Sequence, residues 1–122
     1  MHRSTAVAGA LIGFLGVLAG AFGAHALKNQ LSSDMLQVFE TGARYQMYHA
    51  LALLACALVA GRRERPLAIW AGRLFLAGTV LFSGSLYAVV LLDQPQLGLV
   101  TPVGGLLLLA GWLVLAVATW QR

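Results

Sequence analysis

The sequence contains little charge and very few acidic residues. Only 10% of its 122 residues are Asp, Glu, Lys or Arg, and four of them are acidic. By contrast, 60% are hydrophobic and the mean hydropathy is +0.82. Because so little polar surface cannot coat a water-soluble globule, the composition excludes a soluble domain and indicates an integral membrane protein.

Several chemistries lack the residues that they need. Cys56 is the single cysteine, so no intramolecular disulfide can form, and among alanines and leucines it is most simply a small buried apolar residue. No His-x-x-x-His spacing supports a metal or haem site, and no Gly-x-Ser-x-Gly motif surrounds Ser83 or Ser85. The basic residues form no stripe with interleaved aromatics, which argues against nucleic acid. We expect no metal, no cofactor, no nucleic-acid partner and no enzymatic activity.

What the chain does have is four long apolar runs, at 5–27, 45–60, 67–92 and 101–120. A helix needs about 20 residues to cross the hydrocarbon core of a membrane, and the second run reaches that length only with its polar lead-in. We therefore predict an all-α fold, a four-span transmembrane helical bundle with antiparallel up-down topology. Residues 1–122 would form one integral membrane domain, with spans at about 5–27, 43–61, 67–92 and 101–120.

Basic residues gather on one side of this predicted bundle. Only Lys28 and Arg44 lie near the opposite side, a bias that follows the positive-inside rule and predicts that both termini are cytoplasmic. We expect Arg73, inside the third run, to extend back to the headgroups of the same side. The arginines on the cytoplasmic side are Arg3, Arg62, Arg63, Arg65 and Arg122.

Five glycines mark one stripe of the first span. They are spaced four, three, four and three residues apart, which places them on one side of a helix and lets another helix backbone approach closely. We predict a helix-packing face, used within the chain or in a homo-oligomer, although the stripe could also line a narrow pore or a ligand slot. The glycines are Gly9, Gly13, Gly16, Gly20 and Gly23.

The second helix should begin well before its apolar run. Ser33 or Asp34 is the expected N-cap, and Asp34 with Gln37 resembles a capping box. Because no proline intervenes before Gly61, we predict one continuous helix from the outer surface through the bilayer. Thr101 is the expected N-cap of the last helix.

Polar side chains follow one face of this second helix into the predicted bilayer. Glu40, Arg44 and Tyr48 recur every four residues, and a neighbouring stripe is formed by Thr41, Tyr45 and His49. The antiparallel topology brings the ends of the first and third spans to the same outer side. We therefore predict one outer-side polar pocket, in which Glu40 and Arg44 form an ion pair. Its candidate members are His25, Glu40, Arg44, Tyr45, Tyr48, His49 and Tyr87.

The residues leave the role of that pocket open. It could be purely structural, with histidines and tyrosines hydrogen-bonded between helices. It could also relay protons or ions through Glu40, His49 and His25, although no acid lies in the inner half of any span. A third interpretation, histidine ligation of a haem or metal, lacks any supporting motif.

A series of short motifs runs along nearly the whole chain. The motifs are GAFGAH at 20–25, TGARYQMYHALAL at 41–53, FSGSLY at 82–87, TPVGG at 101–105 and GW at 111–112. Together they resemble the domain of unknown function 423 family, small bacterial inner-membrane proteins that include eukaryotic transmembrane protein 256. The resemblance implies a four-helix protein of the bacterial inner (plasma) membrane with unassigned activity, and it carries over no catalytic residue.

The sequence thus favours a non-enzymatic membrane-organising or assembly component that contacts membrane lipids and forms oligomers through its glycine faces. The alternative is binding or passage of a small solute, lipid or ion through the outer-side polar pocket. An enzyme or redox protein is the third class. A water-filled cavity would favour transport, whereas a flat glycine face on the exterior would favour assembly.

Overall fold

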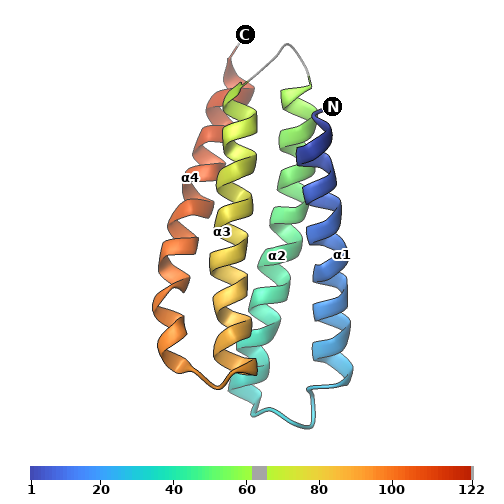
Figure 1. Ribbon diagram of the computed structural model, residues 1–122, viewed down its shortest axis with the longest axis vertical. Coiled ribbons are helices and arrows are strands. Elements are labelled where there is room, and N and C mark those ends of the chain that lie inside the picture. The colour runs from blue at the N-terminus through green and yellow to red at the C-terminus, as the bar shows by residue number, and fades with distance from the viewer. Residues whose placement is uncertain (62–65, 122) are drawn as a thin grey trace.

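The computed structural model describes residues 1–61 and 66–121, which fold into four antiparallel α-helices and one short 3-10 helix (Figure 1). Within these residues there is no strand, so the predicted all-helical bundle is confirmed. The two termini lie at the same end of the bundle (Figure 1). The elements are α1 (Arg3–His25), α2 (Ser33–Ala60), α3 (Pro66–Leu91), η1 (Pro95–Leu99) and α4 (Thr101–Trp120).

Three helical segments in the described part of the chain are long and apolar enough to cross a membrane: α1, α3 and Pro95–Trp120. α2 is not among them because its first turns are polar. That α2 also crosses the membrane remains a prediction. It is supported by the position of α2 between α1 and α3, because α2 packs along both of these helices (Figure 1).

The helices form an open row in chain order (Figure 1). Each helix packs extensively on the next one, whereas α1 meets α3, and α2 meets α4, at only a few points. Among the described residues, α1 and α4 do not touch. In such a row α2 and α3 are not enclosed by the outer helices, so each keeps a face open between its two neighbours.

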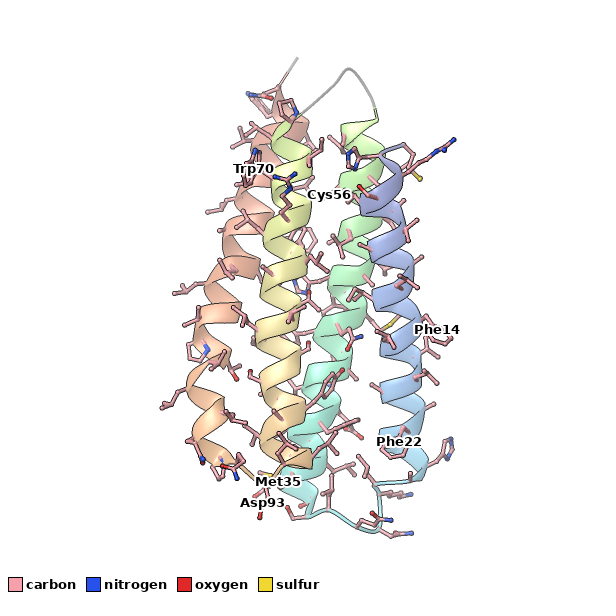
Figure 2. All side chains as sticks on the ribbon, in the orientation of Figure 1. Phe14, Phe22, Met35, Cys56, Trp70 and Asp93 are labelled. Atoms are coloured by element: carbon pink, nitrogen blue, oxygen red, sulfur yellow. The ribbon has the colours of Figure 1, made fainter. Side chains whose placement is uncertain are left out.

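The core lies between α2 and α3. Its largest fully buried side chains are Phe75, Leu53 and Cys56, so the cysteine is buried as predicted (Figure 2). α1 contributes little side-chain volume to the core, because its only buried residues are three glycines. Its large side chains, such as Phe14 and Phe22, are exposed (Figure 2), as lipid-facing side chains are in a membrane helix.

Both predicted N-caps lie one or two residues after the observed ones. The N-cap of α2 is Ser32, whose backbone is extended and whose hydroxyl accepts from the Met35 N–H at 3.2 Å; Ser33 and Asp34 are already helical. Thr101 is likewise the first residue of α4, after Val100. At α2 the neighbouring serine offers the same hydroxyl, so the sequence cannot decide between Ser32 and Ser33. At α4 no side chain caps the helix, and the Thr101 hydroxyl bonds to Ser85 instead. The predicted continuous helix up to Ala60 is confirmed.

Candidate functional site

The structure distributes the seven predicted pocket residues over four places. Tyr45, Tyr48 and His49 line a groove between α2 and α4. Glu40 and Arg44 border a smaller cavity beside α1. The remaining two are separate from both groups, because Tyr87 bonds to a buried glutamine and His25 is exposed at the end of α1.

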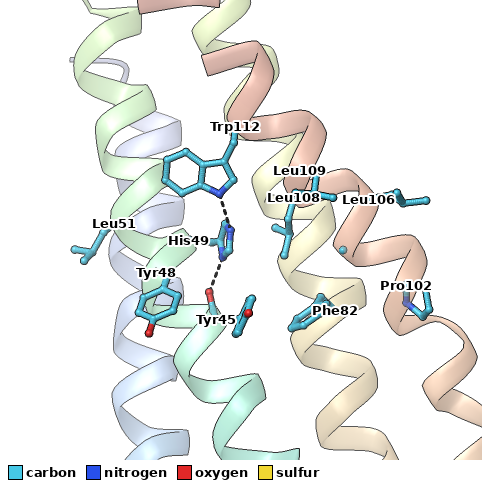
Figure 3. Close-up of a pocket in the computed structure, with 11 residues that line it drawn as sticks. Tyr45, Tyr48, His49, Leu51, Phe82, Pro102, Leu106, Leu108, Leu109 and Trp112 are labelled. Carbon is cyan, nitrogen blue, oxygen red and sulfur yellow. Dashed lines mark hydrogen bonds between the residues drawn. The ribbon is translucent and has the colours of Figure 1, made fainter. Parts of the chain in front are cut away.

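The groove has a volume of about 820 Å³. Tyr45, Tyr48 and His49 form its α2 wall, α4 forms the opposite wall, and Phe82 of α3 lies between them (Figure 3). Apart from the two tyrosine hydroxyls, the imidazole and the Trp112 indole N–H, its lining side chains are apolar. Gly105 widens it, because a Cβ at that position would meet nothing nearer than the Phe82 ring at 3.8 Å.

The groove spans about half of the bundle. It extends along α4 from Pro102, near the end opposite the termini, to Trp112 near the middle of the helix (Figure 3). Ten residues of helix rise about 15 Å, which is half of the roughly 30 Å hydrocarbon core of a bilayer. The groove therefore has the length of one leaflet of acyl chains.

His49 closes the deep end of the groove against α4. Its Nδ1–H donates to the Tyr45 carbonyl at 2.7 Å, and its Nε2 accepts from the Trp112 indole N–H at 3.1 Å (Figure 3). A carbonyl only accepts and an indole only donates, so the proton of a neutral imidazole lies on Nδ1. Phe75 packs on the same ring at 5.5 Å between centroids. Both nitrogens are occupied, which leaves no lone pair for a metal or a substrate.

Gln46 is the central polar residue that the sequence analysis missed. It is 6% exposed; its Nε2 donates to the Ile12 carbonyl at 3.0 Å, and its Oε1 accepts from the Tyr87 hydroxyl at 2.6 Å. These two bonds join α1, α2 and α3. An amide inside an apolar span is a signal that could have identified it, since polar residues in membrane helices commonly bond to neighbouring helices.

Hydroxyl groups of α3 complete this set of interhelical bonds. Ser83 donates to the Gly42 carbonyl of α2 at 2.7 Å. Ser85 lies 2.5 Å from the Thr101 hydroxyl at the start of α4 and also donates to the Phe82 carbonyl. Both serines therefore have partners in the backbone or in a neighbouring helix.

Glu40 and Arg44 lie apart from the groove. They are exposed and border a cavity of about 280 Å³, together with Gly16 and Gly20 of α1. Among the described residues no ion pair joins them, so the expected pair is not formed in this structure. Exposed charges gain little from pairing, and nothing in their surroundings holds the two side chains together.

The glycine stripe of α1 is used mainly within the chain. A Cβ at Gly9 would lie 3.0 Å from the Ala50 carbonyl, and one at Gly16 or Gly23 would meet a side chain of α2 at 2.6 or 2.7 Å. Gly13 has looser contact, and Gly20 has no atom within 4 Å of a Cβ. The structure therefore places three of the five predicted packing glycines directly against α2.

Comparison with known proteins is consistent with this architecture. A family model described as "Protein of unknown function (DUF423)" matches residues 19–105. The chain is 44% identical over 115 residues to a UPF0382 membrane protein of Staphylococcus aureus (strain bovine RF122 / ET3-1), covering 94% of this chain and 93% of that protein. It is also 44% identical to the UPF0382 membrane protein of Staphylococcus saprophyticus subsp. saprophyticus, covering 94% and 95% of the two chains. No solved structure matches the chain.

Proposed function

The chain belongs to the DUF423 family of membrane proteins of unknown function, and from that premise we propose that it is a non-enzymatic lipid-binding protein. It holds one acyl chain of a phospholipid in the groove between α2 and α4, in the leaflet opposite the termini. Through that contact it organises the lipid around it. The observation that carries the proposal is the apolar groove of about 820 Å³, one leaflet long.

The bilayer itself favours an acyl chain as the occupant. An apolar groove that opens sideways into hydrocarbon excludes water, because water there would lose its hydrogen bonds. The volume lies within the range of about 300–1,000 Å³ that is usual for ligand sites. A single chain is long enough to extend from Pro102 to Trp112.

Two tyrosines in the α2 wall of the groove offer a place for the polar end of the lipid. Tyr45 and Tyr48 are 38% and 51% exposed, and their hydroxyls bond to none of the described residues. Both lie near the expected outer start of the α2 span, the level at which tyrosines favour the headgroup region. They can therefore donate to an ester or phosphate oxygen while their rings contact the chain.

A non-enzymatic role is supported by the hydrogen bonds of the polar side chains. His49, the histidine of the groove, uses both ring nitrogens inside the protein. Ser83 and Ser85 donate to backbone carbonyls. None of them is free to act as a general base or a nucleophile.

Assembly of copies through the α1 stripe has less support than lipid binding. Gly9, Gly16 and Gly23 already pack against α2, which leaves only part of the stripe open. We place the protein in the bacterial plasma membrane with cytoplasmic termini, so the groove faces the outer leaflet; the distribution of basic residues supports this orientation.

The test uses phospholipid with brominated acyl chains, which quenches nearby tryptophan fluorescence. In a Trp70→Phe/Trp120→Phe background, Trp112 is the only reporter left. Detergent-solubilised protein is titrated with the brominated lipid at low lipid-to-detergent ratio. We expect saturable quenching, and we expect Gly105→Leu, which fills the groove, to weaken the apparent affinity several-fold. Gly84→Leu is the matched control, because Gly84 is exposed and has open space around it.

Three results would overturn the proposal. Quenching that rises linearly with lipid, without saturation, means that Trp112 senses only bulk lipid. Equal affinity in the Gly105→Leu and Gly84→Leu proteins means that the groove is not the site. A change of oligomeric mass in Gly105→Leu alone, measured by light scattering, means that a second copy of the chain covers the groove.

A further inference from the structure

A second cavity lies between α1 and α3 at the end of the bundle that carries both termini. Its volume is about 190 Å³, and its polar lining consists of His2, Ser4, Thr5 and Arg73. Leu53 of α2 also borders it. This cavity shares no residue with the groove of the proposed function, so the two sites can be tested separately.

The polar groups of this cavity are held in place by the fold. The backbone N–H of His2 donates to the Ala57 carbonyl of α2 at 3.0 Å. Its ring Nδ1 lies 2.8 Å from the Thr5 hydroxyl and 3.4 Å from that of Ser4. Among the described residues, its Nε2 has no partner. One imidazole nitrogen is therefore free to bond to a ligand in the cavity.

Arg73 brings a positive charge to the same place. It lies seven residues into α3, about 10 Å from the start of that helix, and its guanidinium carbon is 4.8 Å from the centroid of the Trp70 ring. Trp70 lies toward the end with the termini (Figure 2). Because Trp70 is three residues closer to the start of α3, the guanidinium extends from its helix position toward the headgroup level of that end.

The described part of the chain offers no acidic partner at this end. Asp34 lies in the first turn of α2 and Glu40 two turns further on, both toward the opposite end. Asp93 follows α3 and also lies at the opposite end (Figure 2). Within these residues Arg73 has only the Trp70 ring as a partner. The fourth acidic residue, Glu64, lies outside the described residues.

We infer that this cavity binds a phosphate group. The Arg73 guanidinium supplies the charge and its parallel N–H donors, which match phosphate oxygens. When Nδ1 of His2 accepts from the Thr5 hydroxyl, Nε2–H of His2 and the Ser4 hydroxyl can donate to the remaining oxygens. An anionic phospholipid headgroup and a free phosphate ion share this chemistry. Basic pockets between membrane helices near the headgroups are typical of headgroup sites.

The experiment compares two lipids and one free ion on the full chain in detergent. The probes are dioleoyl phosphatidylglycerol, the zwitterionic dioleoyl phosphatidylcholine and inorganic phosphate, and native mass spectrometry counts the bound lipid. We expect phosphatidylglycerol to bind more tightly than phosphatidylcholine, and Arg73→Gln to weaken phosphatidylglycerol about fivefold, the factor expected for one basic residue at a membrane surface. Arg73→Lys should retain part of the preference. Lys28→Gln is the matched control, because it removes the same charge at the opposite end.

Each outcome decides the inference. If inorganic phosphate competes with phosphatidylglycerol in the wild type but not in Arg73→Gln, the site binds phosphate and also accepts the free ion. If Arg73→Gln binds phosphatidylglycerol as the wild type does, or if Lys28→Gln weakens it equally, the inference is overturned. Should Arg73→Gln fail to fold, Thr5→Val removes a hydroxyl at nearly constant volume. An unchanged preference in Thr5→Val then counts against the site.

Discussion

The indole N–H of Trp112 donates to Nε2 of His49 across 3.1 Å, and this bond joins α4 to α2 (Figure 3). These two helices are not neighbours in the row and meet at only a few points. The bond therefore fixes the distance between the two walls of the groove at its deep end. His49, which closes the deep end of the groove, therefore also holds α4 in place against α2.

Removing this bond should loosen α4 without unfolding the core. We expect Trp112→Phe to lower the free energy of unfolding by about 1–2 kcal/mol, because the His49 Nε2 acceptor is left without its donor while the ring contact with Phe75 is largely kept. Unfolding in mixed micelles of detergent and sodium dodecyl sulfate measures the change. Trp120→Phe is the control, since Trp120 is 88% exposed.

A double-mutant cycle identifies the cause of that loss. If the hydrogen bond accounts for it, Trp112→Phe and His49→Phe together should cost less than the sum of the two single changes. Additive losses would mean that each residue acts through its own packing and that the bond contributes nothing measurable.

The Gln46 bonds predict coupling across three helices. Gln46→Leu removes both interhelical bonds: the Tyr87 hydroxyl is left without a partner, and the Ile12 carbonyl keeps only its helical bond within α1. We expect a loss of about 1–3 kcal/mol in the same unfolding assay. In the Tyr87→Phe background the further cost of Gln46→Leu should be smaller, because the hydroxyl that this change would orphan is already gone. An equal cost in both backgrounds would contradict the Gln46–Tyr87 bond.

The sequence was sufficient for the helices but not for their arrangement. The apolar runs and the absence of proline before Gly61 predicted four helices and the unbroken α2. In a membrane, however, lipid-facing and protein-facing sides of a helix are both apolar. Periodicity therefore does not reveal which helices are neighbours, and the open row with its groove between α2 and α4 could not be predicted.

The candidate site could be predicted only in part, again because the sequence does not reveal which helices are neighbours. The stripe containing Tyr45 and His49 was visible as polar residues in an apolar run, and both residues line the groove. His25 was grouped with them by topology, which fixes the side of the membrane but not the lateral position. Interhelical bonds of the histidines and tyrosines were one of the expected roles, but their partners, Gln46 and Trp112, depend on which helices are neighbours and could not be identified from the sequence pattern.

We expect Gly→Ala changes at helix contacts to lower the free energy of unfolding by different amounts, according to the atom that the added methyl group would meet. A methyl at Gly104 would collide with the backbone nitrogen of Phe82 on α3, which cannot move without shifting the helix. At Gly16 it would meet the sulfur of Met47, the flexible end of a side chain. We expect Gly104→Ala to cost about 1–3 kcal/mol in the unfolding assay, and Gly16→Ala to cost less.

Gly20→Ala is the control for this series. No atom lies within 4 Å of a Cβ there, and alanine favours a helix over glycine by about 1 kcal/mol, so this change should be neutral or stabilising. Equal losses at Gly104, Gly16 and Gly20 would mean that glycine matters for backbone flexibility and not for close packing.

The orientation of the bundle in the membrane is the last prediction. Gln121 lies at the end that carries both termini, and Gln96 lies in η1 at the opposite end. Because arginines predominate at the first end, we expect a membrane-impermeant maleimide to label Gln96→Cys but not Gln121→Cys in intact cells. Both should react once the cells are permeabilised, and the wild type should stay unlabelled because Cys56 is buried. Labelling of Gln121→Cys alone would invert the topology, and the groove would then face the cytoplasmic leaflet.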